Sequence, residues 1–83
     1  MEIQPFLIGM ADVLEMSPAK INEQTVLIPD RWDSIAILGA IALIDEQFGV
    51  TVPTTESRKC TSLKAVIELV RRTQAEAVAS ESR

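Results

Sequence analysis

An apolar segment near the middle of the chain constrains the fold more than any other feature. The stretch Ile35–Ile44 contains ten residues and nothing polar. Asp33 lies just before it as a favourable helix N-cap, and Gly49 lies after it, where a glycine commonly ends a helix. The pattern predicts a helix over Ser34–Phe48 that is apolar almost all round, so we expect it to be the most buried element.

Helical spacing also marks the start of the chain. Apolar residues recur at helical intervals across Ile3–Leu14, with Pro5 in the first turn, where proline is accepted. Ser17-Pro18 is expected to end this helix, because a residue before proline is pushed out of the α region. Residues 19–32 show no clean period, which indicates a long connection. Four apolar residues are expected to anchor this connection to the core: Ile21, Val26, Leu27 and Ile28.

Two further helices are expected after the central one. Thr54 or Thr55 can cap a short turn of helix around Glu56–Lys59. Thr61 or Ser62 can open a longer final helix. That last helix is expected to bury four apolar residues that share one face: Leu63, Val66, Ile67 and Val70.

These elements define an all-α fold class. Three main helices plus one short helix form a small bundle, with a long loop between the first and second helices. With 83 residues the chain is one small domain, which we expect to span residues 1–77. The C-terminal tail over residues 78–83 is expected to be frayed.

Composition narrows the classes of function. A formal net charge of −4 argues against a nucleic-acid partner, because phosphate backbones attract Lys and Arg. The chain has no histidine and one cysteine, Cys60, so it offers neither a metal-ligand cluster nor the usual general base of an enzyme. The apolar run is too short to span a membrane, and the first five residues lack the basic region that is typical of a signal peptide. We therefore expect a cytoplasmic monomer that is not an enzyme and spans no membrane.

Ser34 is the candidate functional residue. It stands directly after Asp33 at the start of a predicted helix, where backbone N–H groups and the helix dipole favour a phosphate. No histidine is present to activate its hydroxyl as a nucleophile. The position therefore indicates a serine that is modified rather than one that catalyses a reaction.

From Asp33 to the end of the last helix, the sequence resembles the acyl carrier proteins, the phosphopantetheine-carrier family. Asp33-Ser34-Ile35 is similar to the family's Asp-Ser-Leu attachment motif. Phe48-Gly49-Val50 with Val52-Pro53 resembles the end of its second helix and the turn that follows. Further residues fall where the family has its short third helix and its fourth: Glu56, Lys59, Thr61 and Ala65-Val66-Ile67.

The resemblance implies a carrier function. In the family, a separate phosphopantetheinyl transferase uses coenzyme A to join 4′-phosphopantetheine covalently to the motif serine, which here is Ser34. The arm ends in a thiol that holds acyl or aminoacyl groups as thioesters and delivers them between enzymes of a fatty acid, polyketide or other biosynthetic pathway. Asp33 is expected to cap the helix and to help the transferase recognise the site. The implied partners are this transferase and the enzymes that load and transfer the acyl groups.

The surface expected to contact these partners departs from the family's pattern. Typical fatty-acid carriers have acidic residues on the outer face just after the serine, whereas this chain has Ala36 and Gly39 there. The next acidic residues along the chain are Asp45 and Glu46. We expect them either to form a solvated end of the helix or to contact a partner. We therefore expect a largely apolar contact surface. Ile35 is expected either to belong to that surface or to lie in the core.

Two features outside this helix also bear on the interpretation. Arg31-Trp32 replaces the family's Leu-Gly before the motif, which favours a stand-alone specialised carrier, and Trp32 is expected to anchor the loop on the bundle. Cys60 is expected to be a small buried hydrophobe rather than a reactive thiol. An alternative function is an unmodified, carrier-like interaction module that binds partners through the helix over Ser34–Phe48. An exposed alanine and glycine after Ser34 motivate that alternative.

Overall fold

The chain folds into four α-helices and one short 3₁₀ turn, in a computed structural model that describes residues 2–81 and the side chains of residues 2–77. No strand occurs within residues 2–81, where the sheet-like pairing is a single antiparallel bridge between Val26 and Ser62. The all-α prediction is confirmed. In chain order the elements are α1 (Gln4–Val13), η1 (Pro18–Lys20), α2 (Ser34–Phe48), α3 (Thr54–Arg58) and α4 (Leu63–Glu81).

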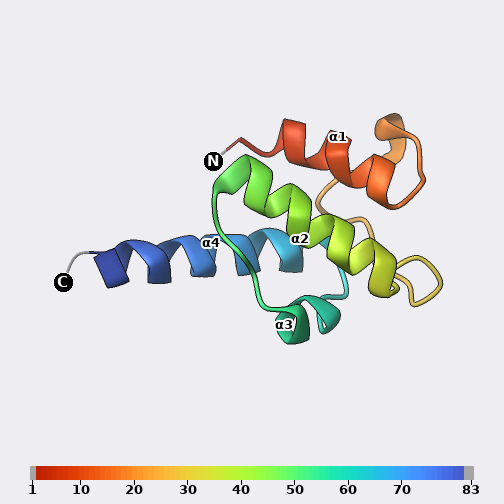
Figure 1. The fold of residues 1–83 in the computed structure, drawn as a ribbon. Helices are drawn as coiled ribbons and strands as arrows, with labels where there is room; N and C mark the ends of the chain where they lie inside the picture. The colour runs from red at the N-terminus through yellow and green to blue at the C-terminus, as the bar shows by residue number, and fades with distance from the viewer. Residues whose placement is uncertain (1, 82–83) are drawn as a thin grey trace.

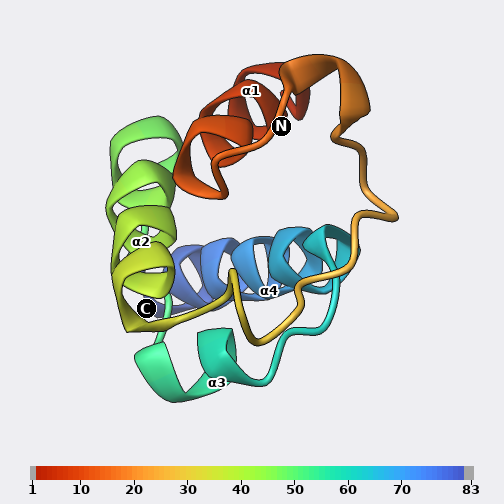
Figure 2. The same cartoon turned by 90° about the vertical axis from the view of Figure 1, so that its right-hand side faces the viewer.

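α2 connects the parts of the bundle, because it packs against α1, α3 and α4 (Figure 1). Figure 2 shows α1, α2 and α4 arranged around a common centre, with the short α3 close to the first turn of α2. The second half of α4 extends away from the bundle (Figure 1), and the longest dimension of the molecule is 42 Å. The beginning of α2 is therefore flanked by α3 and by the long loop that leads into α2.

Both ends of α2 lie where the sequence predicts them. Asp33 Oδ1 accepts a hydrogen bond from the Ala36 backbone N–H at 2.9 Å, which caps the first turn. Gly49 takes a left-handed conformation with φ of 70°, and its N–H donates to the Asp45 carbonyl at 2.9 Å. A residue with a Cβ is strained at that φ, so the glycine supplies the conformation that ends the helix.

The expectation that this helix is the most buried element is wrong. One face of α2 packs inward, while Ile35 and Leu38 are 82% and 61% exposed. A helix that is apolar almost all round is buried on every side only when neighbours surround it, and this small bundle covers one side of α2. The buried residues of α2 are Ala36, Ile37, Ala40 and Ile44.

The first helix ends earlier than predicted. α1 stops at Val13, and Glu15 adopts a left-handed conformation with φ of 55°, which turns the chain before proline is reached. The Met16 N–H then donates to the Ala11 carbonyl at 2.8 Å and closes the turn. Ser17 instead caps η1, where its Oγ accepts from the Ala19 N–H at 3.3 Å.

Two of the four predicted loop anchors are correct. Ile21 and Leu27 are buried, but Val26 and Ile28 are 67% and 44% exposed. The backbone is extended here, because Leu27 N–H donates to the Thr61 carbonyl at 2.9 Å beside the isolated bridge. Successive side chains of an extended segment point to opposite sides, so Leu27 points inward and its two neighbours point outward.

The helices predicted in the C-terminal half are present, but the predicted cap of α3 is wrong. Pro53 is the N-cap residue of α3, and neither predicted threonine caps it; the Ser57 N–H and Oγ both donate to the Pro53 carbonyl, at 3.0 and 2.8 Å. Ser62 caps α4 as predicted, accepting from the Ala65 N–H at 3.3 Å. A frayed tail is predicted over residues 78–83, but the backbone of α4 stays helical through Glu81, and residues 82–83 lie outside the described residues. The expected inward face of α4 is confirmed and gains Leu69: Leu63, Val66, Ile67, Leu69 and Val70.

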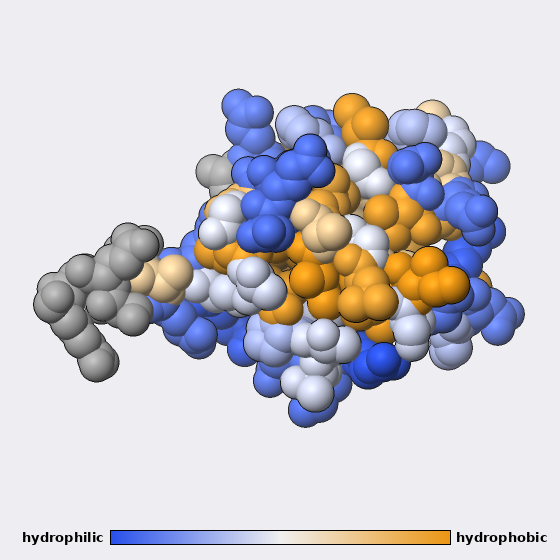
Figure 3. All heavy atoms as spheres, viewed as in Figure 1, coloured by the Kyte–Doolittle hydropathy of each residue, from blue (hydrophilic) through white to orange (hydrophobic). Residues whose placement is uncertain are grey.

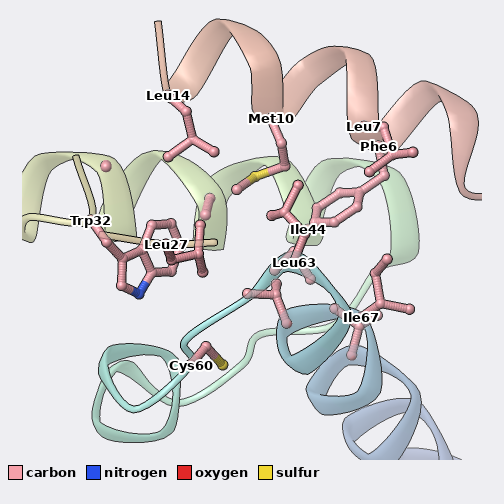
Figure 4. Close-up of a cluster of buried hydrophobic side chains, with 14 of the residues drawn as sticks. Phe6, Leu7, Met10, Leu14, Leu27, Trp32, Ile44, Cys60, Leu63 and Ile67 are labelled. Carbon is pink, nitrogen blue, oxygen red and sulfur yellow. The ribbon is translucent and has the colours of Figure 1, made fainter. Parts of the chain in front are cut away.

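The core is built mainly from aliphatic side chains of α1, α2 and α4 (Figure 4). Phe6 is its aromatic centre on α1 and lies against Phe48 with ring centroids 5.6 Å apart. α1 and α2 approach closely at Gly9, where an added Cβ would lie 2.7 Å from a methyl carbon of Leu43. No helix in the described part of the chain is long and apolar enough to cross a membrane.

Candidate functional site

The first turn of α2 presents Ser34 to solvent. Ser34 and Asp33 are both exposed, and the cap formed by Asp33 fixes the backbone that carries the serine. The Asp33 carbonyl also accepts from the Ile37 N–H at 2.9 Å, so the helix begins sharply at this point. The structure therefore places both sequence-predicted site residues together at an accessible helix start.

Removing the Asp33 cap is expected to lower the free energy of unfolding. We expect Asp33→Ala to cost about 1 kcal/mol, because the Ala36 N–H loses its acceptor in the first turn. Chemical denaturation followed by circular dichroism measures the change. Asp33→Asn is the matched control, since its side-chain oxygen can still cap and it is expected to stay within about 0.5 kcal/mol of the parent. Equal stability of Asp33→Ala and the parent would show that the cap contributes nothing.

A cation lies beside the serine. Arg58, the last residue of α3, donates from Nη2 to Ser34 Oγ at 3.2 Å. The two residues are 24 positions apart in the sequence, so the contact depends on how α3 docks. The sequence predicts Arg58 only as a surface charge. Its role in the site is visible solely in the folded chain.

Trp32 contacts α3 directly. Its indole Nε1–H donates to the Ser57 carbonyl at 2.9 Å, and the side chain is only 8% exposed. Figure 4 shows the indole nitrogen turned toward the short helix. The predicted anchoring role of Trp32 is thus confirmed, with α3 as its contact. Two hydrogen bonds therefore connect α3 to the start of α2: one joins Trp32 to Ser57, and the other joins Arg58 to Ser34.

Carboxylates gather on another side of the first turn of α2. A depression of about 390 Å³ lies there between the end of α1, the long loop and the start of α2. Its lining includes a single cation, Arg31, and Ser34 and Arg58 are not part of the lining. The surroundings of the serine are therefore electrostatically uneven, with Arg58 in contact and acid beyond Asp33. Four acidic residues line the depression: Asp12, Glu15, Asp30 and Asp33.

The predicted partner-contact residues do not form one surface. Ile35 is 82% exposed, which excludes a core position, but Ala36 is buried and is wrong as an exposed contact. Gly39 is half-buried, and an added Cβ would lie 3.5 Å from Val13 on α1, so little of it faces solvent.

The acidic pair of α2 lies apart from the serine. Asp45 and Glu46 are exposed, yet they follow Ser34 by three turns of helix, roughly 16 Å along the axis. Leu38, which the sequence reasoning did not single out, joins Ile35 as an exposed apolar residue near the serine. Figure 3 shows hydrophobic side chains gathered over the face on which α2 lies. The surface beside Ser34 is therefore apolar only in part, and Ile35 and Leu38 supply that part instead of Ala36 and Gly39.

Cys60 is buried between α3 and α4, as predicted. Its Sγ lies 3.6 Å from the Glu56 carbonyl oxygen. Burial raises the pKa of its thiol, with Arg72 lowering that pKa and the Glu56 carboxylate raising it to smaller extents. Cys60 is thus a poor thiolate at neutral pH. Among the described residues, no three His, Cys, Asp or Glu side chains are grouped closely enough to hold a metal ion.

Comparison with known proteins gives no information about function, so the chemistry is argued from the residues of the site. The chain matches no family model, no curated protein and no solved structure. An exposed hydroxyl beside a guanidinium can carry a covalently bound anion, because arginine remains protonated and donates in a planar fork. The carboxylate of the adjacent residue, Asp33, caps α2.

Proposed function

We propose that this protein is a carrier whose Ser34 bears 4′-phosphopantetheine and holds acyl or aminoacyl groups as thioesters. The observation that carries the proposal is the exposed Ser34 hydroxyl at the capped start of α2, in contact with the Arg58 guanidinium. These residues fit a phosphodiester, because the serine oxygen is accessible and the guanidinium can form charge-assisted hydrogen bonds with phosphate oxygens. When attached, the arm supplies a thiol for thioester chemistry that the protein's own buried cysteine does not offer.

The chain's own residues have distinct parts in this function. Asp33 holds the first turn in a fixed geometry, so that the Ser34 hydroxyl is presented outward. Attachment forms a bond between Ser34 Oγ and the phosphorus next to the pantetheine part of coenzyme A, while the bond from that phosphorus to the nucleotide part breaks and the hydroxyl proton is released. The transferase supplies the catalytic groups. Ile35 and Leu38, exposed beside the serine, are the contacts we propose for partner enzymes.

An unmodified interaction module is the second candidate, and the same exposed apolar residues favour it. Ile35 and Leu38 present a partner surface whether or not Ser34 is modified. An exposed alanine after Ser34, which the sequence suggested in favour of this alternative, is not found, because Ala36 is buried. Modification of Ser34 separates the two functions, since the interaction module predicts none.

A thiol titration tests the carrier function. Before modification the only thiol is Cys60, which is buried and is expected to react slowly with a disulfide reagent at neutral pH. After incubation with coenzyme A and a phosphopantetheinyl transferase, followed by removal of coenzyme A, we expect one additional, fast-reacting thiol per chain. The Ser34→Ala variant is expected to gain none. Absence of a fast thiol with several transferases, or its appearance in Ser34→Ala, contradicts the proposal.

A further inference from the structure

We propose that Arg58 holds the phosphodiester on modified Ser34 and thereby directs the arm toward α3. This inference rests on the proposed function and adds a positioning residue to it. Arg58 already donates to Ser34 Oγ at 3.2 Å, the atom that becomes the bridging oxygen of the phosphodiester. Phosphorus would be bonded to that oxygen, and the non-bridging phosphate oxygens would lie two bonds beyond it, within reach of the same planar guanidinium. The guanidinium is exposed, so it can rotate to follow the new charge.

The position of Arg58 is fixed by its neighbour in the chain. Ser57 is 3% exposed, and its carbonyl accepts from the Trp32 indole while its Oγ donates to the Pro53 carbonyl. The backbone that carries Arg58 is therefore tied to the residue two positions before Ser34. The exposed Arg58 side chain extends from this backbone and contacts Ser34 at the start of α2. Figure 2 shows α3 lying beside that end of α2.

Charge on the two flanks gives the arm a preferred direction. The depression between the end of α1 and the start of α2 is lined by four acidic residues and one arginine, and this excess of acid disfavours a phosphodiester there. Arg58 does not line that depression and attracts the phosphodiester from α3. The exposed side chain of Arg58 forms its hydrogen bond with Ser34. Its charge is therefore available to the modified serine.

Phosphorus NMR of the loaded protein tests the contact directly. Arg58→Gln removes the guanidinium, Arg58→Lys keeps the charge without the planar fork, and Lys59→Gln removes an equal charge from the neighbouring exposed residue. In the parent we expect the phosphodiester resonance to move with added salt, because exposed ion pairs are screened. In Arg58→Gln it is expected to lie already at the high-salt position and to be insensitive to salt. Lys59→Gln should behave like the parent, and Arg58→Lys should be intermediate.

The rate of loading gives a second measurement. We expect Arg58→Gln to lower the transferase kcat/KM by at most about fivefold, the size set by one exposed ion pair, with Lys59→Gln unchanged. Circular dichroism checks that both variants keep the helical fold. If the parent loads but Arg58→Gln and Lys59→Gln give the same salt-dependent resonance, the positioning role of Arg58 is excluded while the carrier function stands. If the parent itself does not load with several transferases, the carrier function and this inference are both rejected.

Discussion

Phe6→Ala is expected to lower the free energy of unfolding by about 3–5 kcal/mol, because it removes the largest fully buried side chain from the core. The ring is 0% exposed and also loses its tilted contact with Phe48 at 5.6 Å. A domain of this size has a total stability of about 4–12 kcal/mol, so one substitution removes a large part of it. Urea denaturation at 25 °C, followed by far-ultraviolet circular dichroism, measures the change.

Ile8→Ala is the matched control for Phe6→Ala. Ile8 lies on the same helix, two residues further along, but is 56% exposed. Its truncation is expected to change stability by less than about 1 kcal/mol, since most of the side chain is already in water. A loss in Ile8→Ala as large as that in Phe6→Ala would show that the substitutions act on helix α1 itself rather than on the core.

Trp32→Ala is expected to cost about 3–5 kcal/mol and to release α3 from the start of α2. The substitution deletes an indole that is 8% exposed and leaves the Ser57 carbonyl with the Cys60 N–H, at 3.2 Å, as its remaining donor. Because Arg58 follows Ser57, its contact with Ser34 should be lost as well. Denaturation measures the stability, and hydrogen exchange at α3 amides measures the local release.

Trp32→Phe separates the two contributions of the tryptophan. Phenylalanine keeps most of the buried ring but has no N–H for the Ser57 carbonyl, so we expect a loss of about 1–2 kcal/mol. Exchange at α3 should still be faster than in the parent. If Trp32→Phe and Trp32→Ala are equally stable, packing of the ring contributes little. If exchange at α3 is unchanged in both, Trp32 does not hold α3.

The residues around α2 show which features of the fold a sequence determines locally. Asp33 and Gly49 each act within one turn of the helix end that they mark, through a side-chain cap and a left-handed backbone, and both ends are predicted correctly. Ser62 is a similar case at the start of α4. Glu15 is the counter-example, because its left-handed turn carries no glycine signal and ends α1 before Ser17.

Burial depends instead on neighbours that the sequence does not specify. Ile35 and Leu38 are as apolar as Ile37 and Ile44, and only the positions of α1, α3 and α4 decide which of them face water. Val26 is exposed for the same reason, since pairing of the loop beside Ser62 sets the alternation of its side chains. An apolar pattern identifies the candidates for the core without selecting among them.

The candidate site divides in the same way. Asp33-Ser34 and its helix start follow from the sequence, because the capping side chain and the exposed hydroxyl are adjacent in the chain. The contact with Arg58 does not follow, because it joins residues 24 positions apart through the docking of α3 on Trp32. The carboxylates that line the nearby depression come from α1 and the loop as well as from Asp33. The acidic residues within α2 itself are Asp45 and Glu46, so the sequence of this helix does not reveal the acidic lining of the depression.

Mass spectrometry of the protein after incubation with coenzyme A and a phosphopantetheinyl transferase tests the carrier function most directly. We predict a gain of one phosphopantetheine per chain, located by fragmentation on the peptide that contains Ser34 and absent from Ser34→Ala. Ser17→Ala, which alters another exposed helix-cap serine, should load like the parent. No gain with several transferases, or a gain that persists in Ser34→Ala, would contradict the carrier function.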